Sequence, residues 1–111
     1  MDAPPRPDPR VFAALGDSTR LTLLAQLEGG ASLSATRLAA GAPVSRQAIS
    51  KHLRVLAEAG LVEDLRRGRE RLYRLNPAPL HSAVAWMLPL LSRGEPAAGA
   101  GPAIKAPDRQ A

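Results

Sequence analysis

The segment Pro43–Gly60, with the sequence PVSRQAISKHLRVLAEAG, decides how the rest of the chain folds. When it is placed on a helix at about 100° per residue, Ile49, Leu53 and Leu56 fall within one narrow arc. The spacing predicts one amphipathic helix that buries one face and presents the other to a partner. The opposite arc is polar and holds Gln47, Lys51, Arg54 and Glu58, with Ser50 at its edge.

Both ends of this helix carry sequence signals. Ser45 is predicted to be the N-cap, because its hydroxyl can accept a hydrogen bond from a free amide of the first turn. Gly60 is predicted to end the helix, because glycine adopts the left-handed conformation without a steric penalty. By itself the segment is equally compatible with an ordinary amphipathic surface helix, so the flanking sequence must decide its role.

The composition excludes several classes of protein. The chain has 111 residues, which suffices for one domain, and its 45% hydrophobic and 3% aromatic content predicts an aliphatic core. The absence of cysteine excludes disulfides, thiolate metal ligands and cysteine nucleophiles, and it fits a reducing compartment. The sequence shows no long apolar run and no signal peptide near its start, so we expect a cytoplasmic protein that contacts no membrane.

Positive charge is concentrated in one part of the chain. The net charge is +5, and the span from Ser45 to Leu75 has eight basic against four acidic residues, a net charge of +4. Such concentration is typical of a protein that binds a polyanion, although a solvated basic surface is the alternative. The basic residues are Arg46, Lys51, Arg54, Arg66, Arg67, Arg69, Arg71 and Arg74.

Three helices are expected before the amphipathic one. Residues 1–10 are proline-rich and are predicted to form a disordered arm. A short helix follows over Val11–Leu15, and a second over Ser18–Leu27 begins at Asp17 as N-cap. The second helix is expected to bury Leu21, Leu24 and Ala25, widened by Leu23 and Leu27, and to expose Arg20 and Gln26.

A third helix completes a helix-turn-helix. Ser34 is predicted to cap a short helix over Ala35–Ala40. Residues 41–44, Gly-Ala-Pro-Val, then form a turn, since proline cannot continue a helix. A short helix, a turn of about four residues and an amphipathic helix match the spacing of a helix-turn-helix.

A basic hairpin is expected directly after the amphipathic helix. The period changes to two over Leu61–Arg66, Arg67–Glu70 provides the turn, and Arg71–Leu75 returns as a second strand. The hairpin is predicted to be the wing of a winged helix-turn-helix. A basic hairpin without a ligand is the alternative.

The last helix, expected over Leu80–Leu91, has more apolar surface than so small a core needs. We therefore predict a homodimer through this helix with Val11–Leu15 alongside, and a kink or frayed end at Pro89. The alternative is a helix packed wholly within its own subunit. Residues 93–111 are predicted to be a disordered tail, which leaves residues 11–92 as the domain. The predicted interface residues are Val11, Phe12, Leu80, Val84, Trp86, Met87, Leu90 and Leu91.

The sequence as a whole resembles the ArsR-type bacterial repressors. The resemblance is carried by ALGDSTRLTLLAQL at residues 14–27 and by LSATRLAAGAPVSRQAISKHLRVLAEAGLVEDLRRGRERLYRL at residues 33–75, and it extends over roughly residues 11–91. It implies a dimeric transcriptional repressor that releases its operator on a signal. The fold expected is mainly α with a small β-hairpin, in the order of four helices, two strands and a final helix.

The chain departs from the metal-sensing members of that family. Their thiolate site is a Cys-x-Cys motif in the helix before the recognition helix, and the corresponding TRLAAGA at residues 36–42 has no Cys, His, Asp or Glu. A second type of site uses paired His and Asp/Glu on the last helix, where this chain offers only His81, with Glu95 beyond Gly94. We predict a member without a metal or other cofactor and with an undetermined effector; a metal-responsive repressor is the alternative.

Docking of the recognition helix in the major groove assigns roles to its residues. Ser45, Arg46 and Gln47 occupy the first turn, where Gln47 can bond to adenine and Arg46 to guanine or phosphate. Ser50 is expected near base edges, and Lys51 and Arg54 near phosphates. His52 is only a secondary candidate for DNA contact, because its angle places it on the apolar side of the helix.

Further contacts with double-stranded DNA are expected outside this helix. In the wing, Arg67, Arg69 and Arg71 would reach phosphates or a minor groove. Ser34 and Thr36 can each bond a phosphate. The leading prediction is a homodimeric, autoregulatory repressor of a palindromic operator, and the alternative is a winged helix used for protein–protein contact. An enzyme is not expected, because the chain has no phosphate-binding glycine loop, no paired catalytic carboxylates and only two histidines.

Overall fold

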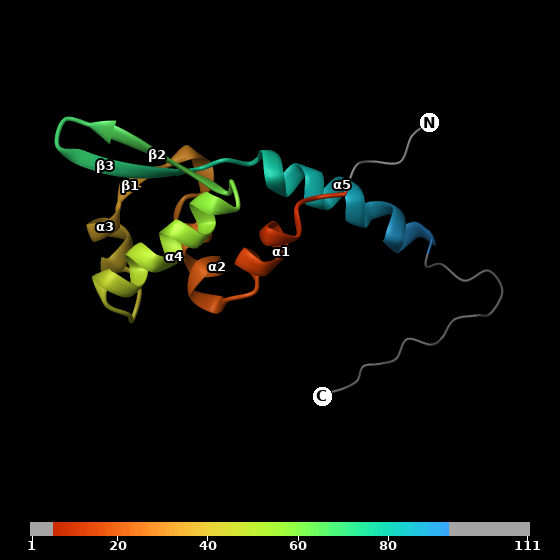
Figure 1. The fold of residues 1–111 in the computed structure, drawn as a ribbon, viewed down its shortest axis with the longest axis horizontal. Coiled ribbons are helices and arrows are strands. Elements are labelled where there is room, and N and C mark those ends of the chain that lie inside the picture. The colour runs from red at the N-terminus through yellow and green to blue at the C-terminus, as the bar shows by residue number, and fades with distance from the viewer. Residues whose placement is uncertain (1–5, 94–111) are drawn as a thin grey trace.

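The computed structural model describes residues 6–93 as helices that pack around a core, with a small sheet at one end (Figure 1). The predicted mainly helical winged helix-turn-helix is confirmed. Residues 1–5 and 94–111, for which we expect disorder, lie outside the described residues. The elements are α1 (Pro9–Leu15), α2 (Ser18–Gln26), the 3₁₀ turn η1 (Glu28–Gly30), β1 (Ser32–Ser34), α3 (Ala35–Ala40), α4 (Arg46–Glu58), β2 (Val62–Arg67), β3 (Glu70–Leu75) and α5 (Ala78–Arg93).

Helix α4 has the predicted caps and the predicted buried face. The Ser45 hydroxyl accepts a hydrogen bond of 3.1 Å from the Ala48 amide. At the other end, Gly60 has φ 78°, its amide donates to the Ala57 carbonyl, and the Leu61 amide donates to the Leu56 carbonyl. This pair of bonds is a Schellman motif, which satisfies two carbonyls and turns the chain into β2. Ile49, Leu53 and Leu56 are all buried.

Helix α1 begins at Pro9, two residues earlier than expected. Asp8 is the N-cap, and its carboxylate accepts a hydrogen bond of 2.9 Å from the Arg10 amide. Proline is favourable in the first helical turn because its missing N–H would have no helical partner there. The proline-rich sequence therefore starts a helix instead of preventing one.

The predicted face of α2 is wrong by about one residue position. Leu23 and Leu27 are fully buried, whereas Leu21 is 50% exposed and Ala25 is exposed. Arg20 and Gln26, expected in solvent, are both half-buried. The segment LTLLAQL has apolar residues on most of its circumference, so the packing of α2 against α1 and α4 decides which side is buried.

The predicted hairpin is present as β2 and β3, and a strand that we do not predict, β1, joins it to form a three-stranded antiparallel sheet in the order β1-β3-β2. Strand β1 has only three residues, which is too short to display a period of two. It pairs Leu33 with Tyr73 and Ser34 with Leu72. The sheet thereby connects the start of α3 to the wing.

The loop of the hairpin is shorter than predicted. Arg67 pairs with Glu70, so that only Gly68 and Arg69 connect the strands. Gly68 has φ 65°, as tight two-residue hairpin loops require. Hereafter "wing" means β2, β3 and this loop.

Helix α5 leaves the body of the domain after the wing. Asn76 fixes its start: the Asn76 amide donates to the Leu61 carbonyl, and its side chain donates to the Gly60 carbonyl, each at 2.9 Å. Ala83 is buried, and Trp86 packs edge-on against Phe12 of α1 with ring centroids 6.1 Å apart. The helix spans two residues more at each end than the predicted Leu80–Leu91, and it continues through Pro89, where we expect a kink or a frayed end. Its last turns extend away from the other helices (Figure 1).

Within residues 6–93, no helix combines the length and the apolar character needed to cross a membrane.

Candidate nucleic-acid interface

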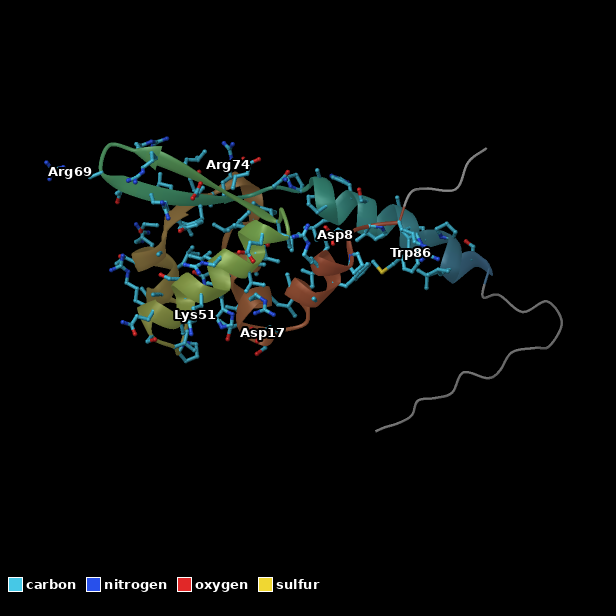
Figure 2. The ribbon with its side chains drawn as sticks, in the orientation of Figure 1. Asp8, Asp17, Lys51, Arg69, Arg74 and Trp86 are labelled. Atoms are coloured by element: carbon cyan, nitrogen blue, oxygen red, sulfur yellow. The ribbon has the colours of Figure 1, made fainter. Side chains whose placement is uncertain are left out.

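The outward face of α4 presents an uninterrupted set of polar and basic side chains. Ser45, Arg46 and Gln47 at its first turn are all exposed, as are the later residues Ser50, Lys51 and Arg54. The predicted polar face therefore lies where a partner has access to it. Figure 2 labels Lys51 on this helix.

A groove runs beside this face, between α3, the first turns of α4 and the wing. It has a volume of about 680 Å³. Five arginines line it against a single glutamate, so the groove attracts anions. We call it the arginine groove; its lining residues are Ser34, Ala35, Thr36, Arg37, Arg46, Ser50, Arg66, Arg69, Glu70, Arg71 and Tyr73.

The structure locates the five residues outside α4 and its N-cap that we predict to contact DNA. Ser34 and Thr36 line the arginine groove, as do Arg69 and Arg71. Arg69 projects from the tip of the hairpin (Figure 2). Arg67 does not line the groove, because it lies next to Arg66 in β2 and successive strand residues point to opposite faces.

The serine caps keep a donor available for a phosphate. The Ser34 hydroxyl accepts a hydrogen bond of 3.1 Å from the Arg37 amide, as predicted for an N-cap. Because a hydroxyl is both a donor and an acceptor, its proton can still be donated to a phosphate oxygen. The same holds for Ser45, whose oxygen accepts from Ala48.

The site includes two arginines that we do not predict from the sequence. Arg37 of α3 and Arg66 of β2 both line the arginine groove and are both exposed. Arg37 is separated from the wing by about 30 positions in the sequence, so only the tertiary fold joins it to the wing arginines. Arg66 belongs to the basic cluster, but the strand register that decides its face is not readable from a loosely alternating segment.

Acidic side chains of the wing hold two of its arginines. Arg71 Nε lies 3.5 Å from an Asp64 carboxylate oxygen, and Arg74 donates to Glu63 at 2.9 Å. The Tyr73 side chain, followed by the charge of Asp64, raises the pKa of Arg71. Tyr73 is half-buried and packs against the core. Arg71 thus has an acidic partner within the wing, whereas the hydrogen bonds and ion pairs of residues 6–93 include none from the Arg69 side chain.

His52 lies on the packed side of α4, as its helical angle predicts. It is half-buried, and its Nδ1 atom lies 3.2 Å from Arg20 Nη1 and 3.8 Å from an Asp17 carboxylate oxygen. The structure gives this histidine the Arg20 side chain as its partner. The hydrogen bond from the Arg20 amide, and then the charge of the Arg20 side chain, lower the pKa of Asp17.

A second, apolar surface lies on the outer half of α5. Leu91 is 74% exposed, and Val84, Met87 and Leu90 are also exposed, together with Leu88, which we do not predict. These five residues form a shallow hollow of about 330 Å³, which we call the α5 face. Other predicted interface residues have less surface available: Phe12, Leu80 and Trp86 are half-buried, and Val11 is buried in the core of its own subunit.

Comparison with known proteins shows to which family the chain belongs. Residues 15–64 match the family model described as a helix-turn-helix domain. The transcriptional repressor SdpR of Bacillus subtilis is 35% identical over 85 residues, which is 77% of this chain and 93% of that protein. An ArsR-like transcriptional regulator from Rhodococcus sp. RHA1 is 44% identical, with a TM-score of 0.68, over 77% of this chain and 79% of the other. The chain belongs to the ArsR family.

The ArsR fold extends to more distant structures. The homodimeric winged helix-turn-helix domain Mb0332 from Mycobacterium bovis is 24% identical, with a TM-score of 0.60, over 77% of each chain. This ArsR-family chain is thus a DNA-binding transcriptional regulator and not an enzyme. The arginine groove and the polar face of α4 are its candidate DNA-binding surfaces.

Proposed function

We propose that the protein is a homodimeric repressor that binds a palindromic operator, with α4 of each subunit in the major groove and the wing over the neighbouring backbone. The observation that carries this proposal is the continuity of the polar α4 face with the arginine groove. A duplex that receives a helix in its major groove presents phosphates on both sides of that helix. The groove supplies cations on one of those sides.

Individual residues take different roles in this complex. Gln47 and Ser50 read base edges, and Arg46 bonds guanine or phosphate. Lys51 and Arg54 contact phosphates along the outer side of α4. Around the arginine groove, Ser34, Thr36, Arg37, Arg66, Arg69 and Arg71 hold the backbone. We also propose that Arg67 contacts phosphate from the outer side of the wing, while His52 serves mainly to pack α4.

A second copy of the chain is the proposed occupant of the α5 face. Helix α5 also contacts α1 of its own subunit through Trp86 and Phe12, so α1 lies beside the helix that carries this face. The Mycobacterium bovis domain with the same fold is homodimeric, which supports the same arrangement here. A two-fold dimer places two recognition helices about 34–36 Å apart and therefore favours a palindromic site.

We propose a regulator whose signal is not a transition-metal ion. The sequence has no cysteine, and residues 6–93 contain no group of three or more His, Cys, Asp or Glu arranged to hold a metal. Zinc sites in proteins need about four ligands. A regulator that controls its own transcription is the simplest function compatible with this; a metal-responsive repressor remains the alternative.

DNase footprinting on the chain's own upstream region tests the proposal. A two-fold symmetric protected site is expected. With about 6–10 phosphate contacts, the affinity should fall roughly 10³–10⁵-fold between 50 and 200 mM salt. No footprint combined with salt-independent binding to proteins would favour the protein–protein module instead. Release of the DNA by micromolar zinc or arsenite would favour the metal-responsive alternative.

A further inference from the structure

One side chain, Arg20 of α2, ties the recognition helix to the end of α1. Its Nε donates to the Ala14 carbonyl at 2.8 Å, and its Nη2 donates to the Ala13 carbonyl at 3.3 Å. Its Nη1 lies 3.2 Å from Nδ1 of His52 on α4. The guanidinium group thus bridges the last turn of α1 and the packed side of α4, for which its planar set of five donors is suited.

Arg20 is itself held in place. Its amide donates to an Asp17 carboxylate oxygen at 3.0 Å, which is the N-cap bond of α2. The same carboxylate lies 3.8 Å from His52 Nδ1 (Asp17 is labelled in Figure 2). An arginine only donates hydrogen bonds, so the Nδ1 atom must accept this one and the ring proton resides on Nε2.

The bond to Arg20 differs in kind from the other contacts of α4. The buried side chains Ile49, Leu53 and Leu56 are aliphatic, and their contacts have no preferred direction. Among the hydrogen bonds of residues 6–93, the bond to His52 is the single side-chain bond between α4 and another helix. A directional bond can therefore set the rotation of α4 about its axis and its position along that axis. The directions of the neighbouring Ser50 and Lys51 side chains depend on both.

We propose that Arg20 is a positioning residue for DNA binding, and that it acts through the Nδ1 atom of His52. Arg20 does not line the arginine groove, so its effect on DNA affinity passes through the orientation of α4. Because α1 also contacts α5 through Phe12 and Trp86, the same bond connects the recognition helix to the proposed dimer helices. The inference rests on the docking of α4 proposed above.

Substitution of His52 by asparagine or by glutamine separates the role of its Nδ1 atom from that of its Nε2 atom. The side chain of asparagine places an acceptor near the position of Nδ1, and that of glutamine places its terminal group near Nε2. The experiment measures the affinity of full-length His52→Asn, His52→Gln and His52→Leu for a duplex selected from random sequence by the wild-type protein. Fluorescence anisotropy is recorded at one salt concentration and at a temperature where circular dichroism shows each variant folded.

We expect His52→Asn to bind within about twofold of wild type, and His52→Leu and His52→Gln to bind about tenfold more weakly. Arg20→Met should lose a similar factor in affinity for DNA. The affinity of the double variant Arg20→Met/His52→Leu should be no lower than that of the single variant that binds DNA more weakly. If Arg20→Met does not fold, the comparison of Asn, Gln and Leu at position 52 decides alone.

Three outcomes overturn the proposal. If His52→Gln binds well and His52→Asn does not, Nε2 contacts the DNA directly. Equal affinities for all variants mean that the bond stabilises the fold without orienting α4. Losses that add in the double variant mean that Arg20 acts independently of His52. Gln47→Ala serves as the control and should weaken DNA binding if α4 docks as proposed. If Gln47→Ala binds as tightly as wild type, the docking of α4 itself is wrong, and not only the role of Arg20.

Discussion

At the scale of single residues, the surface of this protein separates into side chains that are oriented before DNA binds and side chains that are not. Arg71 is held by Asp64, and Arg74 by Glu63, so both keep a defined direction. Gln47 and Arg69 have no side-chain hydrogen bond among the described residues, and they lie on different elements. This difference in environment predicts different consequences for their removal.

Replacement of Gln47 by alanine is expected to relax the preference for one base pair in each half-site, by roughly 1–3 kcal/mol of discrimination, because a base edge loses its partner. Replacement of Arg69 by alanine should weaken all sequences alike and reduce the slope of log affinity against log salt by about one, because a phosphate contact is lost. Competition binding with single-base operator variants checks both. Equal, sequence-independent losses in the two variants would contradict the assigned roles.

Asp17 predicts a pH dependence of stability. Its pKa is lowered below the ordinary 3.8, first by the hydrogen bond from the Arg20 amide and then by the charge of the Arg20 side chain. A lowered pKa means that the ionised carboxylate contributes stability above the ordinary pKa, and that this contribution is lost as the pH falls through the lowered value. Wild type should therefore exceed Asp17→Asn in melting temperature at pH 6, and the difference should shrink as the pH falls below 3.8. A pH-independent difference would exclude a role for the charge, since asparagine also caps helices well.

At the scale of elements, the junction between α4 and β2 determines where the wing stands relative to the recognition helix. Gly60 ends α4 in a left-handed conformation, and the Asn76 side chain binds its carbonyl. Asn76 thereby ties the start of β2 to the end of β3. Because the two elements proposed to contact DNA meet here, strain at this junction should affect the fold before it affects any single contact.

Gly60→Ala is expected to lower the free energy of unfolding by about 1–2 kcal/mol, because an L-residue in the left-handed conformation suffers a steric penalty. Gly16→Ala is the matched control: Gly16 also follows a helix, but its φ of −86° suits any residue and an added Cβ meets only ordinary contacts. Urea unfolding of the two variants measures the difference. An equal effect of both substitutions would show that the conformation of Gly60 carries no special strain.

At the scale of the whole molecule, α5 is longer than one subunit can cover. Its first turns pack on the core through Ala83 and the Trp86 ring, whereas the outer turns extend from the body (Figure 1). Exposed leucines at 88, 90 and 91 are costly for a monomer, since burial of apolar surface gains about 25 cal/mol per Å². A second copy that covers them also doubles the number of recognition helices on one DNA.

Leu91→Lys should convert the dimer into a monomer with little change in the fold of the subunit, because this side chain is 74% exposed. The affinity for a two-site operator should fall by roughly 100-fold or more as avidity is lost. Ala85→Lys, exposed on α5 but outside the α5 face, is the control and should remain dimeric. Sedimentation equilibrium together with anisotropy on one- and two-site duplexes checks both; a Leu91→Lys dimer would show that another surface joins the subunits.

Features of this protein that depend on local chemistry are predictable from the order of its residues. The serine caps at 34 and 45, the left-handed Gly60, the aliphatic face of α4 and the apolar excess of α5 are all readable from residue type and spacing. Each of these depends on neighbours within about four positions, or on a single period that only one face can satisfy. The basic hairpin also follows from its alternation and its glycine, although not its length.

Packing between distant parts of the chain selects the buried side of α2, adds β1 to the sheet, and brings Arg37 together with Arg66 and Arg69 in one groove. It also decided that His52 bonds to Arg20, across 32 positions of sequence. The physical reason is the same in each case. A leucine-rich helix, a three-residue strand and a solvated arginine are each compatible with several local arrangements, and the choice is made by packing against residues distant in the chain.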